Sequence, residues 1–191
     1  METLSGDLLI FEAPSVVTGF RALASIEKPD VQVIDASPSG AGRFLILLKG
    51  SSAALHEIQK AMRDAVVDEV GYDEPVDHEL IENANGALLE AAYSLLPQKL
   101  NGSLVVIETD SVSAMFAAGQ IFVEHQKLTP LEIKIRKTGG KGAYGFFTGP
   151  AELCALAAQD VRTRFKDAVR EAKILVFDEP NEAIRSMFEG A

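Results

Sequence analysis

The chain has 191 residues, of which 47% are hydrophobic, and a formal net charge of -10 at pH 7. This length can bury one core of moderate size or two small ones. The acidic balance argues against nucleic acid or an anionic membrane surface as a partner, because binding to either depends on clustered Lys and Arg.

The first half reads as alternating strands and helices. An apolar run at residues 7–11 leads to Ser15, a good N-cap, and to a helix over residues 16–27 with apolar positions at helical spacing. Residues 31–36 and 44–48 form two short strands around a glycine turn, which predicts a hairpin. A second helix over 51–65, a fourth strand over 66–72 and a third helix over 77–95 complete this half.

The second half repeats this order. Glu12 and Ser15 return as Glu108 and Ser111, 96 positions later. The glycine turn and the strand that follows it return 99 positions later, and residues 72–75, aromatic-Asp-Glu-Pro, return at 177–180. The expected strands and helices are residues 103–107, 112–125, 131–137, 144–148, 151–172, 173–177 and 181–188. Four matches in the same order indicate a duplication.

Two tandem α+β domains are therefore predicted, residues 1–98 and 99–191, with the boundary at a Pro, Asn and Gly-containing stretch. Each is expected to form a four-stranded, mainly antiparallel sheet with helices packed on it, in the ferredoxin-like manner.

Motifs that suggest chemistry occur in the wrong context. Residues 140–145 match GxGxxG, but they lead into an expected strand and not into a helix, which argues against a nucleotide site. His56, His78 and His125 have no metal-ligand spacing. Cys154 is the single cysteine, so one chain has no internal disulfide and no Cys-rich iron–sulfur or zinc site. We assign no catalytic residue, metal or cofactor, and expect no enzyme.

Localisation follows from similar arguments. No apolar run approaches the roughly 20 residues that span a bilayer, and the first residues lack the basic then apolar order of a signal peptide. We expect a cytoplasmic protein.

The second half resembles the bacterial microcompartment shell domain. Ile107-Glu108-Thr109, a Val- and Ala-rich helix, then Lys137-Thr138-Gly139-Gly140-Lys141 and a strand ending in Thr148-Gly149 look like that family's most recognisable stretch. The resemblance extends over nearly all of both halves, although the first is more divergent. It implies an unpermuted tandem-domain shell protein that forms a homotrimer with six domains, contacts other shell proteins, and passes small metabolites through a central pore in a bacterial shell.

The resemblance also implies roles for individual residues. The pore loops are Ser39, Gly40, Ala41 and Gly42 in the first half, and Thr138, Gly139, Gly140 and Lys141 in the second, with Ala41 and Gly140 at their tips. Edge contacts between neighbouring assemblies are expected at Lys28, Glu74, Glu124 and Glu179. Three of these are glutamates where the family has basic residues, which disfavours flat self-tiling and favours docking beside basic shell partners.

Two questions stay open at this point. A trimeric ferredoxin-like regulatory module that binds a small ligand at domain interfaces is the alternative, and a long exposed loop in place of the glycine turn would favour it. Lys137 and Lys141 either gather around the pore, where they would favour anions, or point along the outer face into solvent.

Overall fold

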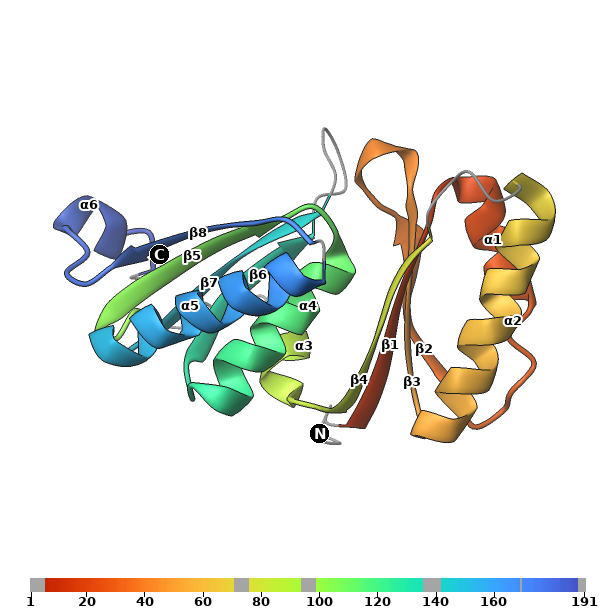
Figure 1. The fold of residues 1–191 in the computed structure, drawn as a ribbon, viewed down its shortest axis with the longest axis horizontal. Helices are drawn as coiled ribbons and strands as arrows, with labels where there is room; N and C mark the ends of the chain where they lie inside the picture. The colour runs from red at the N-terminus through yellow and green to blue at the C-terminus, as the bar shows by residue number, and fades with distance from the viewer. Residues whose placement is uncertain (1–5, 71–75, 94–98, 136–141, 169, 189–191) are drawn as a thin grey trace.

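The computed structural model describes residues 6–70, 76–93, 99–135, 142–168 and 170–188, and these contain two four-stranded antiparallel sheets (Figure 1). The first has the order β2-β3-β1-β4 and the second the order β6-β7-β5-β8. The strands are β1 Gly6–Ala13, β2 Gln32–Pro38, β3 Phe44–Gly50, β4 Asp77–Ala84, β5 Ser103–Thr109, β6 Thr129–Ile135, β7 Ala143–Gly149 and β8 Ala172–Phe177. The predicted α+β class with two ferredoxin-like units is confirmed.

The two sheets share their hydrogen-bond register as well as their strand order. Glu12 of β1 lies opposite Asp77 of β4, and Glu108 of β5 lies opposite Lys173 of β8. Each second strand also carries an irregularity at the same place, after residue 33 and after residue 130. Residues 8–12 of β1 and 77–81 of β4 therefore have structural counterparts in β5 and β8, 96 positions later.

Helices cover both faces of the first sheet and one face of the second. They are α1 Val16–Ala24, α2 Ser52–Val70, α3 Gly86–Tyr93, α4 Val112–Gln120, a π-helical continuation of α4 over Ile121–His125, α5 Ala151–Asp167 and α6 Glu182–Arg185. α1 and α2 lie on the outer face of the first sheet, and α3 and α4 lie between the two sheets (Figure 1). Ser15 and Ser111 are N-caps, as predicted, and accept hydrogen bonds from Thr18 N and Ala114 N at 3.2 and 3.1 Å.

The fourth strand of the first half lies elsewhere than predicted. Residues 66–70 belong to α2, which buries Met62 and Val66 one turn apart. The strand is β4, Asp77–Ala84, where a helix was predicted, and the helix is the shorter α3. The error came from the aromatic-Asp-Glu-Pro match, because residues 177–180 follow β8 whereas residues 72–75 precede β4.

The first sheet is buried on both faces. Leu9 and Phe11 face the core under α1 and α2, whereas Leu8 and Ile10 belong to the core shared with the second sheet. Side chains alternate between the faces of a strand, so a continuous apolar run is the pattern of a strand covered on both sides. Residues 8–11 and 44–48 are such runs, and every one of these residues is buried.

The second sheet is fully covered on one face only. Val105, Ile107 and Phe147 pack under α4 and α5 in the shared core. On the opposite face, Val106 and Phe146 are half-buried beside a small cluster that contains Phe188 from the chain end. β7 alternates accordingly between buried and half-buried residues, where β3 has buried residues at five successive positions.

The expected domain boundary at residue 98 or 99 stays a prediction, since residues 94–98 lie outside the described part. Leu88 and Leu89 of α3, which precede that boundary, pack in the shared core with Phe122 and Ile133 of the second half. The chain before the boundary thus contributes to the core of the second sheet.

Two glycines at the ends of the hairpin loops allow a test of this packing. Gly42 and Gly142 both have positive φ angles, of 78° and 79°, but a Cβ at Gly42 would meet no atom within 4 Å and one at Gly142 would lie 1.9 Å from the carbonyl oxygen of Thr109. Gly42→Ala should lower the free energy of unfolding by about 1 kcal/mol through backbone strain. Gly142→Ala should lower it by about 3 kcal/mol or more, because backbone must move. Urea unfolding of both variants measures this, and equal losses would contradict the Gly142 contact.

Candidate functional site

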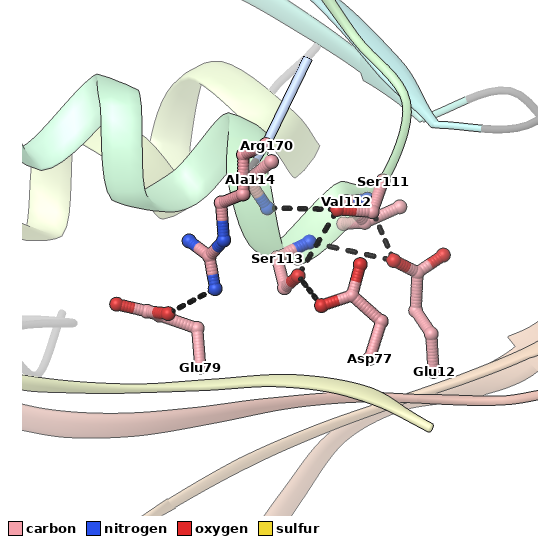
Figure 2. A network of polar contacts seen from close by, with 8 residues as sticks. All are labelled: Glu12, Asp77, Glu79, Ser111, Val112, Ser113, Ala114 and Arg170. Carbon is pink, nitrogen blue, oxygen red and sulfur yellow. Dashed lines mark hydrogen bonds and ion pairs between the residues drawn. The ribbon is translucent and has the colours of Figure 1, made fainter. Parts of the chain in front are cut away.

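The two halves meet where α4 begins above the first sheet (Figure 2). Glu12 Oε2 accepts hydrogen bonds from the amides of Val112 at 2.7 Å and Ser113 at 3.4 Å. The first amides of a helix have no partner within the helix, and the helix dipole makes that end favourable for an anion. A carboxylate on the first sheet therefore fixes the start of a helix from the second half.

Glu12 is almost completely removed from water, because only 1% of its surface is exposed. Desolvation is the largest influence and raises the pKa of Glu12. The nearby charge of Arg43 and the two amides lower it in part, and Asp77 raises it further. The ionised form is thus held by the helix start and one arginine instead of by water.

Two further contacts join the halves to one side of Glu12 (Figure 2). Ser113 Oγ donates to Asp77 Oδ1 at 2.6 Å, so β4 also holds the first turn of α4. Arg170, just before β8, forms an ion pair with Glu79 of β4, with Nη2 and Oε2 2.5 Å apart. This pair is half-buried and the second-half arginine reaches across to the first sheet.

The other end of α4 is held as well. Asn85 follows β4 and donates from Nδ2 to Glu124 Oε1 at 2.7 Å, and its amide donates to Gln120 Oε1 at 3.1 Å. Both ends of the helix are therefore fixed to the first sheet or to the residues directly after it. We define the docked interface as this helix face together with Glu12, Asp77 and Glu79.

The docked interface was not predicted, although its signal was present in the sequence. The repeat aligned Glu12 with Glu108 and Ser15 with Ser111, so a carboxylate at the end of each first strand and a capped helix start after it were both visible. Nothing in the sequence indicated that the carboxylate of one half meets the helix of the other.

The first predicted pore loop forms a tight turn between β2 and β3. Ser39 and Gly40 are buried, and Ala41 and Gly42 are exposed, in one turn of 3₁₀ helix at Gly40–Gly42. Ala41 and Gly42 have positive φ angles of 60° and 78°, which glycine tolerates readily and alanine at a cost. The loop therefore presents a small side chain at its tip, and its role stays a prediction.

Thr138, Gly139, Gly140 and Lys141 of the second predicted pore loop, and Glu74 of the predicted edge, lie outside the described residues.

Lys28 is exposed and forms an ion pair with Glu57, which raises the pKa of Lys28. Glu124 contacts Asn85 and, at 3.8 Å, Lys127, and Glu179 is exposed after β8. The structure does not bring these edge residues together within one chain.

The described residues offer little for chemistry. Among them, no three His, Cys, Asp or Glu side chains are grouped as a metal site would need. None of the helices in the described ranges is long and apolar enough to cross a membrane. Cys154 is buried, and burial raises the pKa of its thiol, which disfavours the reactive thiolate.

One hollow of about 370 Å³ opens where β5 ends and β8 begins. Residues 108–110 and 170–173 line it, and most of these side chains are polar or charged. Burial is the main influence that raises the pKa of Asp110 at its rim. The hollow lies on the second sheet at the place where Glu12 and Asp77 lie on the first.

Comparison with known proteins supports the fold. No family model matches the sequence, and no curated protein matches it. Among solved structures, a microcompartment protein from Desulfitobacterium hafniense DCB superposes with a TM-score of 0.77 at 19% identity, covering 94% of this chain and 98% of that one. A double-ringed trimeric shell protein from the RMM microcompartment superposes with a TM-score of 0.56 at 16% identity, covering 84% and 83%. The fold is thus that of solved microcompartment proteins over nearly the whole chain.

Glu12→Gln tests the environment of the buried carboxylate. A group whose pKa is raised on folding stabilises the fold fully below its unfolded value, about 4.5, and loses that contribution as pH rises through the folded pKa. The parent's free energy of unfolding should therefore fall relative to that of Glu12→Gln between pH 4.5 and 7. Chemical unfolding at several pH values measures this, with the exposed Glu90→Gln as the control. A pH-independent difference between parent and Glu12→Gln would contradict the raised pKa.

Proposed function

We propose that this chain is a structural component of a bacterial microcompartment shell, and that three copies form a ring of six similar units around a central pore. The observation that carries the proposal is the superposition on a solved microcompartment protein over 94% of this chain. The neighbour described as a trimeric shell protein supports the trimer. Microcompartments are bacterial, so the expected location is a shell in the cytoplasm.

The duplicated units support the ring. A ring of six equal units needs each unit to contact the next in the same way, and one chain already joins two such units through the docked interface. Three chains then supply six units, with docked interfaces alternating with contacts between chains.

The first pore loop supports an opening that side chains do not close. Ala41 is exposed at the tip, and Gly42 beside it carries no side chain. Three copies of this loop, with three copies of the loop around Gly140, would line the axis. We propose that Lys137 and Lys141 give this opening its charge, which favours small anionic metabolites over cations.

The proposed edges are acidic. Exposed Glu179, with Glu74 and Glu124, would repel like edges of neighbouring trimers, so we propose that the trimer docks beside other shell proteins with basic edges. Lys28, already paired with Glu57, would be the basic contact of the first unit.

The regulatory alternative is less well supported. A long exposed loop in place of the glycine turn would favour it, whereas β2 and β3 are joined through a single 3₁₀ turn, Gly40–Gly42. We assign no catalytic function, and no nucleic acid or membrane as a partner.

The solution mass of the protein tests the trimer directly. We expect a mass three times 20.5 kDa by light scattering at micromolar concentration. A chain that stays monomeric at high micromolar concentration would overturn the assembly.

Lys141→Glu tests the proposed charge of the pore. Replacing three ammonium groups near one axis by three carboxylates reverses the sign of the local potential, and salt screens both. Anion permeation or anion occupancy on the axis should fall several-fold in Lys141→Glu and be nearly unchanged in Lys99→Glu, which alters an exposed lysine outside both loops. Equal anion occupancy in parent and Lys141→Glu would refute charge selection by this loop.

A further inference from the structure

α1 is the counterpart of α4 and begins in the same way. Both helices have nine residues and start after a serine N-cap with extended backbone angles, φ -144° for Ser15 and φ -142° for Ser111. The amides that α4 donates to Glu12 are those of Val112 and Ser113, whose counterparts are Val16 and Val17. α1 thus presents the same helix start that the first sheet binds in α4.

The counterparts differ sharply in burial. Val112, Ser113 and Phe116 of α4 are all completely buried against the first sheet. Val16, Val17 and Phe20 of α1 are exposed by 37%, 63% and 60%. An exposed cluster of this kind on one helix face is typical of an interaction surface. We call these three residues and the first turn of α1 the α1 face.

The second sheet carries the counterpart of the surface that receives α4. Leu8, Ile10 and Ile81 face α4 in the shared core, and their counterparts by register are Leu104, Val106 and Phe177. Leu104 is buried beside Phe188, Val106 and Phe177 are half-buried, and neighbouring Leu175 is 55% exposed. This outer face of the second sheet is apolar and only partly covered, whereas Leu8, Ile10 and Ile81 on its counterpart are all buried.

The second sheet also has polar residues at the positions that correspond to Glu12 and Asp77. Glu108 occupies the register position of Glu12, and the hollow at residues 108–110 and 170–173 lies beside it. Residues 108–110, 172 and 173 are the counterparts of residues 12–14, 76 and 77, among which Glu12 and Asp77 bind the first turn of α4. We call Glu108, this hollow and the partly covered sheet face the receiving face.

Both residues of the Ser113–Asp77 contact are replaced at the corresponding positions of the α1 face and the receiving face. In the docked interface, Ser113 donates a hydrogen bond to Asp77. Their counterparts are Val17 and Lys173, and Lys173 lies 3.6 Å from Glu108. Val17 of one copy can pack on the aliphatic part of the Lys173 side chain of another copy, so the two residues are compatible. A serine at position 17 would find no carboxylate acceptor at position 173.

We propose that the receiving face binds the α1 face of a second copy of this chain, with Glu108 accepting hydrogen bonds from the amides of Val16 and Val17 of that copy. This rests on the proposed function, since three such contacts close the proposed ring. The two faces differ and lie on opposite units, so the contact is head-to-tail and each copy uses both faces.

Cysteine cross-linking tests the contact at residue level. Ser113 Oγ and Asp77 Oδ1 are 2.6 Å apart, so Val17→Cys and Lys173→Cys should come close between copies. Co-expressed single variants should form a cross-linked dimer on oxidation, and neither alone should do so. Cys154 is buried and does not interfere. Val33→Cys, at an exposed position on β2, replaces Val17→Cys in the control and should give no dimer with Lys173→Cys.

A charge exchange tests the role of Glu108 without cross-linking. Val17→Lys places an ammonium group opposite Lys173 of the next copy and repels it. Glu108→Arg repels the positive end of the α1 dipole. Each should weaken self-association about tenfold to a hundredfold, and Val17→Lys combined with Lys173→Asp should associate more tightly than Val17→Lys alone. Leu156→Asp, at an exposed position of α5, should leave self-association unchanged.

The outcomes separate this inference from the proposed function. A parent trimer with no 17–173 cross-link and with unchanged association of both charge variants overturns the contact and leaves the shell trimer standing. A 17–173 cross-link in rings of another size supports the contact and overturns the trimer. A monomeric parent overturns both. Circular dichroism of each variant confirms folding before any comparison.

Discussion

A carboxylate removed from water needs fixed dipoles or charges close by, and the start of a helix is one of the few places that supply them. Glu12 meets this requirement only if α4 begins directly above it, with the amides of Val112 and Ser113 within hydrogen-bond distance. Burial of Glu12 without that helix would leave an uncompensated charge. The placement of the second half on the first sheet depends on this contact.

The position of α4 on the first sheet also explains which sheet surfaces are apolar. Once α4 lies on the first sheet, both faces of that sheet are covered, and β1 and β3 need apolar residues at successive positions. The second sheet gains a helix layer on one face only. Each chain is therefore left with one partly covered sheet face and one exposed helix face, which are counterparts of surfaces that fit together within the chain.

Duplicated units can diverge in sequence where one unit makes a contact within the chain and the other makes a contact between chains. Asp77 and Lys173 hold the same register position, yet the first accepts a hydrogen bond from Ser113 and the second lies beside Glu108. A contact within one chain forms at high effective concentration, whereas a contact between chains must also limit wrong pairings. The different pairs at these two positions are suited to keeping the two kinds of contact apart.

The sequence alone determined the class of fold, the N-caps at Ser15 and Ser111 and the glycine turn, because each depends on local propensity or on periodicity within a few residues. It also determined the duplication, because the same local patterns recur in the same order about 96 positions apart. Only the tertiary structure decided where β4 lies, since its polar residues, such as Asp77 and Glu79, face the second half and hide the alternation of a strand. The docked interface was out of reach for the same reason. Glu12 and Val112 are 100 positions apart, and no local pattern states which helix start a buried carboxylate will meet.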